Sequence, residues 1–448
     1  MPSGALHEER PARSPMAAIV IAGSIITAIS LGVRATMGLF TDEIDMALGV
    51  GVDTFGLTIA VQNLVWGLSQ PLVGTFADRF GAGRVLMAGA VVYAGGLLVM
   101  ANADGAAGLY TGGGLIVGLG MSAASFAVVL SSIGKLVEPS RRSMALGIAT
   151  AFGSFGHFLL VPITRVFIEL LGWRGSLVFL ALVTMVIAAV VRPLRTGTRI
   201  TEAEGADRLG PSSIDPGSAG RDQESLGQLT GRALRHRDYL LVNAAFFVCG
   251  FHVTFIGVHL PKSLTDAGYG SSVATWSLAF IGLFNIFGAF AAGLLGVRFN
   301  QSRLLSIIYV TRAVAFAGLL LLPVMPVVAL GFGALLGVVW LASVPLTSGI
   351  VLGQFGVRNA GTLFGFVFLS HQVGAFLGSW GAGEIRELTG SYDLWWWLAA
   401  ALGVVAAVIH FSISDKPAPA QPVLGAGPAP APSAGASAAL AAQPPNTP

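Results

Sequence analysis

The chain has 448 residues, of which 54% are hydrophobic and only 10% charged, and its net charge is +3. Its mean hydropathy is +0.77. Soluble domains carry about 25% charged residues, so this composition excludes an ordinary water-soluble enzyme and predicts an all-α integral membrane protein. The single cysteine, Cys249, excludes an intrachain disulfide and a thiolate metal cluster. We expect no cofactor and no metal, because no His, Asp and Glu residues have metal-ligand spacing.

Apolar runs long enough to cross a bilayer occur twelve times. A membrane helix needs about 20 apolar residues, and charged or turn-forming clusters separate the runs. The first six are residues 17–40, 55–77, 84–103, 107–134, 143–169 and 174–192. The second six are residues 238–262, 272–296, 303–323, 327–353, 360–386 and 392–413. The sequence therefore predicts twelve transmembrane helices in two six-helix bundles, residues 17–192 and 238–413.

Three further segments are too polar, or too rich in Pro and Gly, to enter the bilayer. Residues 1–16 form an N-terminal tail, and residues 193–237 form a linker rich in Arg, Asp, Glu, Gly and Ser. Residues 414–448 are mostly Pro, Ala, Gly and Ser. Such compositions cannot bury a core, so we expect cytoplasmic segments outside the bundles and a disordered C-terminal tail.

Positive charge is concentrated on one side of the predicted membrane, which sets the orientation because cytoplasmic loops are enriched in Lys and Arg. The termini and the loops after even-numbered helices hold Arg10, Arg13, Arg79, Arg84, Lys135, Arg141, Arg142, Arg298, Arg303, Arg358 and Lys416. The opposite loops hold Asp42, Glu43, Asp45, Asp53, Asp104, Asp266, Glu384, Glu387 and Asp393. This pattern predicts a multi-pass protein of the inner membrane with both termini in the cytoplasm.

The two halves of the chain repeat each other. Residues 74–86 align without gaps with residues 293–305, and Gly147 and Gly156 align with Gly365 and Gly374. Two bundles of the same orientation, joined by a long linker, form a transporter architecture. In such folds the substrate site lies between the bundles near the bilayer midplane.

One motif carries a family resemblance. Gly74-Thr-Phe-Ala-Asp78-Arg79-Phe80-Gly81-Ala-Gly-Arg84 resembles the cytoplasmic signature of the major facilitator superfamily, and Gly172-Trp173-Arg174 is similar to its sequence before helix six. The resemblance covers residues 17–413. It implies alternating access, with helices one and seven lining a central cavity.

Three shorter motifs resemble the bacterial monocarboxylate and oxalate–formate branch. They are Gln62-Asn63-Leu-Val-Trp66-Gly67, Cys249-Gly-Phe-His252 together with His259-Leu-Pro261, and Ser370-His371-Gln372. The chain departs from eukaryotic monocarboxylate carriers in two places. Helix one lacks their acidic-Gly start, and helix eight lacks the Asp and Arg that couple a proton to the substrate.

Ionisable side chains inside a bilayer cost about 2.5–3.5 kcal/mol each on insertion scales, so each needs a reason. Arg34 lies about 25 Å along the first helix at ~1.5 Å per residue. Gly32-Val-Arg34 aligns with Gly250-Phe-His252, and the resemblance places both on cavity-lining helices. We therefore expect Arg34 and His252 to face each other, with Arg34 clamping a carboxylate. The alternative is a structural Arg34 bound to helix-end carbonyls.

Polar residues on helices two and eleven complete the predicted substrate site. Asn63 and Trp66 lie on one stripe of helix two, and His371 and Gln372 lie halfway along helix eleven. His157 on helix five is a weaker candidate. Each of these side chains could bind substrate or hydrogen-bond across helices.

Other charged residues are expected to gate the path. At cytoplasmic helix ends these are Asp78, Arg79, Arg84, Arg141 and Arg142. Contacts between a carboxylate and arginines there would hold one state closed. Near the outer surface, Arg165 could guide anions or pair with Glu169, and His259 could belong to a gate or precede a helix end at Pro261. Arg312, on a peripheral helix, is expected to be structural.

These patterns predict secondary active transport of a small organic anion, a mono- or dicarboxylate, by a monomer that is not an enzyme. A proton or a counter-anion is the candidate coupled species. No nucleic-acid partner is expected, and the glycine run at 112–118 lacks the Lys-Ser/Thr of a phosphate loop. The alternatives are an exporter of larger amphipathic compounds and a non-transporting sensor. A membrane enzyme would need paired intramembrane acids or a metal set.

Overall fold

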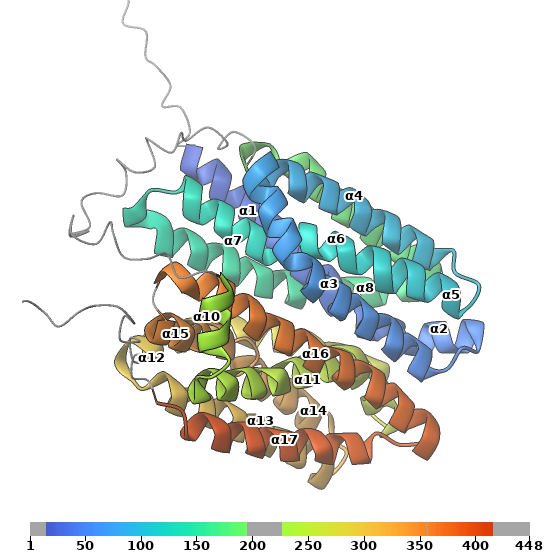
Figure 1. Cartoon of the computed structure of the whole chain (residues 1–448). Helices are drawn as coiled ribbons and strands as arrows, with labels where there is room; N and C mark the ends of the chain where they lie inside the picture. Colours follow the sequence, from blue (N-terminus) through green and yellow to red (C-terminus); the bar gives the residue numbers. More distant parts are fainter. Residues whose placement is uncertain (1–14, 195–225, 356, 415–448) are drawn as a thin grey trace, which may run out of the picture.

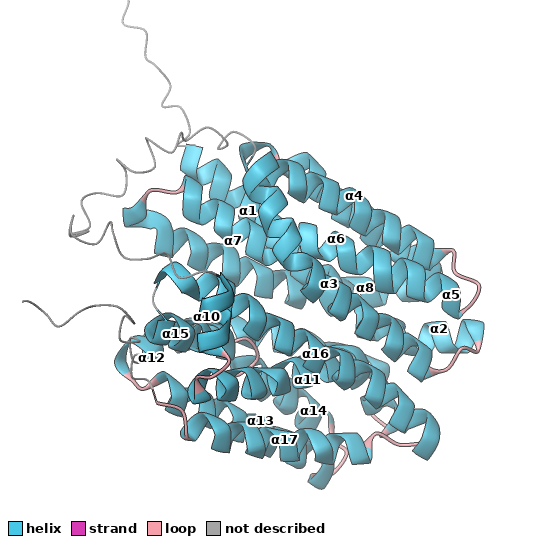
Figure 2. Ribbon diagram, in the orientation of Figure 1, coloured by secondary structure: helices cyan, strands magenta, loops and turns pink. Residues whose placement is uncertain are grey.

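The computed structural model describes residues 15–194, 226–355 and 357–414. Every regular element in these ranges is helical (Figure 2), as predicted. Most of the predicted tails, 1–16 and 414–448, and of the predicted linker, 193–237, lies outside the described residues. The described end of that linker forms a short amphipathic helix, α10 (Leu226–Ala233), which was not predicted. Its Arg232 lies over the ring of Phe355.

The helices of the two halves form two groups that lie side by side (Figure 1). The first half contains α1 (Pro15–Ala35), η1 (Met37–Phe40), α2 (Thr41–Leu48), α3 (Val52–Phe80), α4 (Ala82–Ala101), α5 (Ala106–Leu109), η2 (Tyr110–Ile116), α6 (Val117–Ala123), α7 (Phe126–Leu136), α8 (Pro139–Val190) and η3 (Arg192–Leu194). The second half contains α10, α11 (Arg237–Asp266), α12 (Ser271–Arg298), α13 (Gln301–Leu321), α14 (Pro326–Val338), α15 (Ser343–Phe355), α16 (Val357–Thr389) and α17 (Asp393–Phe411).

All twelve predicted spans coincide with helical segments. Ten helical stretches of the described chain are long and apolar enough to cross a membrane. One of them holds two predicted spans, because α8 bends at Gly172, whose φ of 68° lies in the left-handed region that favours glycine. The remaining span is α3, a 29-residue helix that carries Gln62, Asn63 and Gln70 along its length.

The fourth and tenth spans, predicted as continuous, are each broken. The first break falls at Ala124–Ser125, between α6 and α7, and the second at residues 339–342, between α14 and α15. Ser125 caps α7 by accepting a hydrogen bond from the Val128 amide. Ser125 aligns with Ser343, the first residue of α15, in the sequence repeat. The two halves therefore share a discontinuous helix, a feature that marks substrate sites in transporters.

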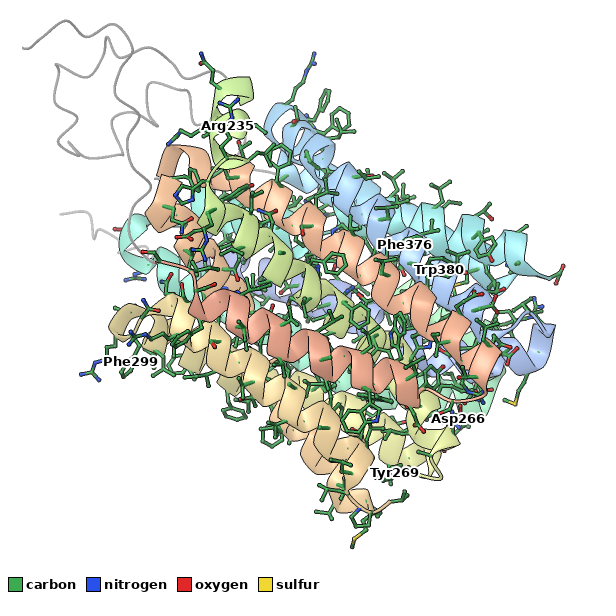
Figure 3. The ribbon with its side chains drawn as sticks, turned by 60° about the horizontal axis from the view of Figure 1, so that its bottom comes forward. Arg235, Asp266, Tyr269, Phe299, Phe376 and Trp380 are labelled. Atoms are coloured by element: carbon green, nitrogen blue, oxygen red, sulfur yellow. The ribbon has the colours of Figure 1, made fainter. Side chains whose placement is uncertain are left out.

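The two ends of the helix assembly differ in charge and in the elements that they hold. Figure 3 shows Arg235 and Phe299 at one end and Asp266 and Tyr269 at the other. We call the first the α10 end and the second the α2 end, after the short helices found there (Figure 1).

Close helix packing follows the repeat. A Cβ at Gly156 of α8 would strike the backbone of Ala28 in α1, and a Cβ at Gly374 of α16 would strike the backbone of Phe247 in α11. By contrast, Gly147 and Gly365 have no atom within 4 Å of a built Cβ. The aligned pair Gly156 and Gly374 therefore permits close helix contact in both halves, whereas the aligned pair Gly147 and Gly365 lies in open space.

This difference predicts the effect of adding one methyl group at each glycine. Gly156→Ala and Gly374→Ala should each cost about 1–3 kcal/mol, because the backbones must move apart. Gly147→Ala and Gly365→Ala, on the same two helices, are the matched controls and should leave the thermal unfolding midpoint of the purified protein unchanged. If all four variants unfold at the same midpoint temperature, the close contacts at Gly156 and Gly374 do not stabilise the helix packing.

Candidate functional site

The side chain of Arg34 lies against helix α3 in the middle of the first half. Its Nη2 donates to Asn63 Oδ1 at 3.2 Å, and its guanidinium lies 5.2 Å from the centre of the Trp66 ring. Arg34 and Trp66 are both half-buried. A cation over an indole face is a favourable arrangement, but it leaves most of the guanidinium donors available to another acceptor.

Residues of α16 join this group from the other half. Gln372 Nε2 donates to the Asn63 carbonyl at 2.9 Å, and His371 Nδ1 lies 2.9 Å from Gln372 Oε1. Phe368 packs edge-on against Trp66 and stacks on His371. The structure thus brings five predicted residues into one connected group, which we call the seam cluster: Arg34, Asn63, Trp66, His371 and Gln372.

A hydrogen-bonded chain links the seam cluster to the broken fourth span. Trp66 Nε1 donates to Gln70 Oε1 at 2.9 Å, and Gln70 Nε2 donates to Ser125 Oγ at 3.3 Å. Because Ser125 also caps α7, the chain ends at the N-terminus of a half-helix, whose dipole favours negative charge. Ser125 is a residue that sequence reasoning missed; its alignment with Ser343 was the available signal.

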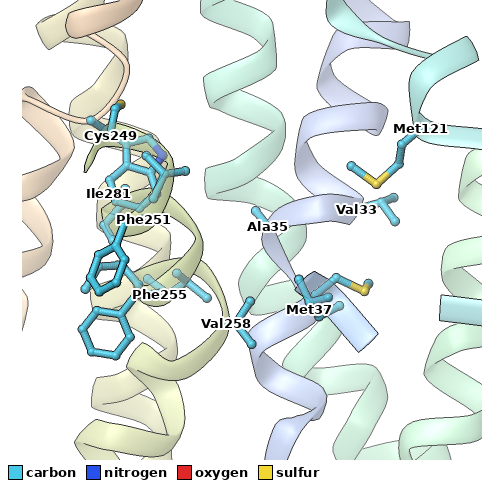
Figure 4. Packing of buried hydrophobic residues seen from close by; sticks show 14 of the residues in the cluster. Val33, Ala35, Met37, Met121, Cys249, Phe251, Phe255, Val258 and Ile281 are labelled. Atoms are coloured by element: carbon cyan, nitrogen blue, oxygen red, sulfur yellow. The ribbon is translucent and has the colours of Figure 1, made fainter. Parts of the chain in front are cut away.

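His252 lies elsewhere, inside the second half. Its Nε2 is 2.9 Å from the Ala399 carbonyl, its ring packs edge-on against Phe316, and it is only 1% exposed. Figure 4 shows Phe251 and Phe255 on the side of α11 away from α1, whereas Val258 faces Met37. Among the described residues no contact joins His252 to Arg34. Aligned residues of a repeat occupy equivalent places in their own halves and need not face each other.

Arg312 is completely buried and is held by helix-end carbonyls. Its Nη2 donates to Val339 O at 2.8 Å and to the Trp340 carbonyl, and Nε donates to Val339 O at 3.3 Å. These oxygens lie at the break after α14, where a helix leaves carbonyls without internal partners. This geometry fits the structural role predicted for Arg312.

Polar contacts tie the two halves together at the α2 end. Lys262 Nζ of α11 lies 2.8 Å from Asp42 Oδ1, and Glu387 Oε1 of α16 accepts from the Val52 amide at 2.9 Å. Ser379 Oγ donates to the Gly56 carbonyl at 2.8 Å. His259 is buried beside this contact, with Nε2 2.8 Å from the Ser379 carbonyl.

The other predicted gating residues whose side chains the structure describes are half-buried or exposed. Arg165 pairs with both Glu169, at 2.9 Å, and Glu43, at 3.2 Å, within the first half. Arg79, Arg84 and Arg141 are exposed at the α10 end. The side chains of Asp78 and Arg142 lie outside the described part of the structure. Across the described ranges, no three His, Cys, Asp or Glu side chains are grouped to hold a metal ion.

Two similar helix groups with a polar cluster at their seam define a secondary-transporter fold. The family model of the Major Facilitator Superfamily matches residues 21–379. The chain therefore belongs to this superfamily, as the sequence motifs indicated, and is a multi-pass membrane transporter rather than an enzyme.

Relatives and solved structures agree with this assignment. Monocarboxylate transporter 11 of Mus musculus is 26% identical over 84% of this chain and 82% of its own length. An uncharacterized MFS-type transporter of Bacillus subtilis (strain 168), YcxA, is 28% identical over 75% of this chain and 80% of its own. A D-xylose-proton symporter structure has a TM-score of 0.70 at 14% identity, covering 90% of this chain and 100% of the symporter. A nucleoside transporter structure has a TM-score of 0.69 at 13% identity, covering 88% of this chain and 99% of the transporter.

The contacts at the α2 end predict which substitutions loosen it. Lys262→Gln should favour separation of the halves there, because Asp42 loses its charged partner from the other half and keeps only the longer hydrogen bond from Thr265. The measurement is the labelling rate of Ser379→Cys, in a Cys249→Ser background, by a membrane-impermeant maleimide; Lys262→Gln should raise it several-fold.

The control is Arg386→Gln, which removes a 2.7 Å pair with Asp266 inside the second half and should not change the labelling rate. A Lys262→Asp, Asp42→Lys exchange should restore slow labelling. Equal rates in all variants would show that the Lys262 pair does not hold the α2 end closed.

Proposed function

We propose that the protein carries a small organic anion, a mono- or dicarboxylate, across the inner membrane by alternating access. Arg34 supports this proposal most directly. It is a cation in the last turn of α1, near the middle of the apolar stretch Met16–Leu48, and its described contacts are a neutral amide oxygen and an aromatic ring. A charge in this position is costly unless paired, and a carboxylate can accept two parallel hydrogen bonds from a guanidinium.

The rest of the seam cluster suits the same role. Asn63 orients Arg34, Trp66 supports its flat face, and His371 and Gln372 bring polar groups from the other half. The names of the monocarboxylate transporter relatives favour a carboxylate substrate. The xylose and nucleoside transporter structures bear on the fold alone.

We infer that the α10 end faces the cytoplasm, since the exposed Arg79, Arg84 and Arg141 lie there, as do the first residues of α1 and the last residues of α17. The contacts of Lys262, Glu387 and Ser379 would then close the outer end, with His259 and Arg165 beside them. Asp78, Arg79, Arg84, Arg141 and Arg142 would close the inner end in the opposite state. A proton or counter-anion is the coupled species in this cycle.

Carboxylate binding to purified Arg34 variants tests the proposed function. Losing a buried charged partner should cost about 2–5 kcal/mol, which is roughly thirtyfold or more in affinity. Arg34→Ala should show this loss, and Arg34→Lys should also fail because it keeps the charge but not the planar fork. Arg174→Lys is the control, since Arg174 binds the Ala101 and Ala103 carbonyls. Folded Arg34 variants with unchanged affinity would make Arg34 a structural cation.

The proposed inner gate gives a separate expectation. Asp78→Asn should lower the rate of counter-flow in proteoliposomes, because it removes the negative charge available to Arg141 and Arg142. Substrate affinity at equilibrium should stay within about threefold, since the residue lies far from Arg34. A large loss of affinity would place Asp78 in substrate binding instead.

A further inference from the structure

One buried side chain joins the first half to the break in the tenth predicted span. Asn285 lies on α12 and is only 2% exposed. Its Nδ2 donates to Ser154 Oγ of α8, in the first half, at 2.8 Å. Its Oδ1 accepts from the Leu341 amide, between α14 and α15, at 3.0 Å. The nitrogen and the oxygen of one side-chain amide therefore contact different halves of the protein.

The Leu341 amide depends on this contact. Among the described residues no backbone carbonyl accepts from it, because the helix is interrupted there. The carbonyls of the two preceding residues, Val339 and Trp340, are held by Arg312. Since an unsatisfied buried backbone group costs free energy, Arg312 and Asn285 together stabilise the shape of the break. Of these two side chains, Asn285 is the one with a described hydrogen bond to the first half.

Glycines bring the α12 backbone close to the helices on both sides. A Cβ on Gly282, one turn before Asn285, would strike the backbone of Phe158 in α8. A Cβ on Gly288, one turn after Asn285, would strike the Val338 carbonyl at the end of α14. Such close packing leaves little room for other arrangements of the side chain between these contacts. A movement of α8 relative to α12 must therefore act on the hydrogen bonds of Asn285.

The sequence repeat supplies an independent observation. Trp66 aligns with Asn285 in the same register as the motif that begins at Gly74. The Trp66 ring packs edge-on against a ring of α16, in the other half. Through Gln70 it is also linked to Ser125, at the break in its own half. Equivalent positions of the two halves therefore contact both the opposite half and the discontinuous helix of their own half.

We propose that Asn285 is a positioning residue for transport, which couples the arrangement of the halves to the break between α14 and α15. In the described arrangement, with polar contacts closing the α2 end, Asn285 binds Ser154 and Leu341 together. When the halves rearrange, α8 moves relative to α12, the Ser154 contact is lost, and the Leu341 amide is held less firmly. This inference requires no particular substrate, so it goes beyond the proposed function and is tested apart from it.

The first test measures opening of the α2 end in the absence of substrate. The reporter is again Ser379→Cys in a Cys249→Ser background, labelled by the same maleimide in the full-length protein in lipid nanodiscs. Ser154→Ala removes a contact of the closed arrangement, so the open population should rise. The labelling rate should increase about two- to tenfold, which is the effect of one neutral hydrogen bond.

A double-mutant cycle shows whether Asn285 and Ser154 act through each other. Asn285→Leu, which has a similar volume, should also raise the labelling rate. Adding Ser154→Ala to Asn285→Leu should raise the rate no further, because the contact is already lost. Rates that multiply in the double variant would show that the two residues act independently, and this result would overturn the proposal.

The second test measures hydrogen–deuterium exchange of the peptide that contains Leu341, in the chain without the reporter substitutions. Ser154 belongs to the other half and does not contact Leu341, yet Ser154→Ala should speed exchange of this peptide about two- to tenfold. A serine with only a local structural role would leave this exchange unchanged. If Asn285→Leu does not fold, this measurement decides alone, and unchanged exchange overturns the proposal.

Two serines on the same helices provide matched controls. Ser176 Oγ of α8 donates to the Gly172 carbonyl at 2.8 Å, and Ser277 Oγ of α12 donates to the Ala329 carbonyl at 2.7 Å. Both hydrogen bonds are buried and remain within one half. Ser176→Ala and Ser277→Ala should therefore change neither the labelling rate nor the exchange. Effects equal to those of the Ser154 variant would indicate general loosening and would overturn the proposal.

Discussion

The need to satisfy buried arginines in a low-dielectric interior shapes this molecule. Arg312 and Arg34 both lie within membrane helices but are satisfied differently. Arg312 fills its hydrogen bonds with the Val339 and Trp340 carbonyls at the break after α14. Arg34 has one neutral amide oxygen and an indole face. An arginine whose donors are taken up by the Val339 and Trp340 carbonyls and by Cys249 Sγ is a structural element, whereas one with donors to spare can bind an anion.

The repeat makes this contrast informative. Tyr93 aligns with Arg312 at the offset that relates residues 74–86 to 293–305. Each side chain lies beside the discontinuous helix of its own half, Tyr93 against Gly120 and Arg312 against Trp340. In the second half, the Arg312 guanidinium therefore satisfies the free carbonyls at the helix break. The first half places a buried phenol at the equivalent position, with no hydrogen-bond partner among the described residues. Equivalent positions of the two halves therefore hold a guanidinium bound to carbonyls in one case and a phenol in the other.

The sequence predicts the parts of this structure that depend on local hydropathy. The twelve spans and the repeat follow from apolar runs and spacing, and the seam cluster follows because polar residues in such runs are costly. The two helix breaks could not be predicted. At the first break the apolar run continues through Ala124 without interruption. The second break depends on a contact between helices, in which Asn285 Oδ1 accepts from the Leu341 amide. The direction of His252 depends on which face of α11 packs against α16, and a tyrosine such as Tyr93 resembles ordinary core.

Asn63 connects the anion site to the seam between the halves. Its side chain accepts from Arg34, while its backbone carbonyl accepts from Gln372 of the other half. A ligand that draws Arg34 Nη2 away from Asn63 Oδ1 therefore acts on a residue that already contacts α16. An effect on transport rather than on binding requires that the ligand favour one arrangement of the halves over the other. The two hydrogen bonds of Asn63 supply a direct physical route for that preference, because its side chain contacts Arg34 and its backbone carbonyl contacts Gln372 of the other half.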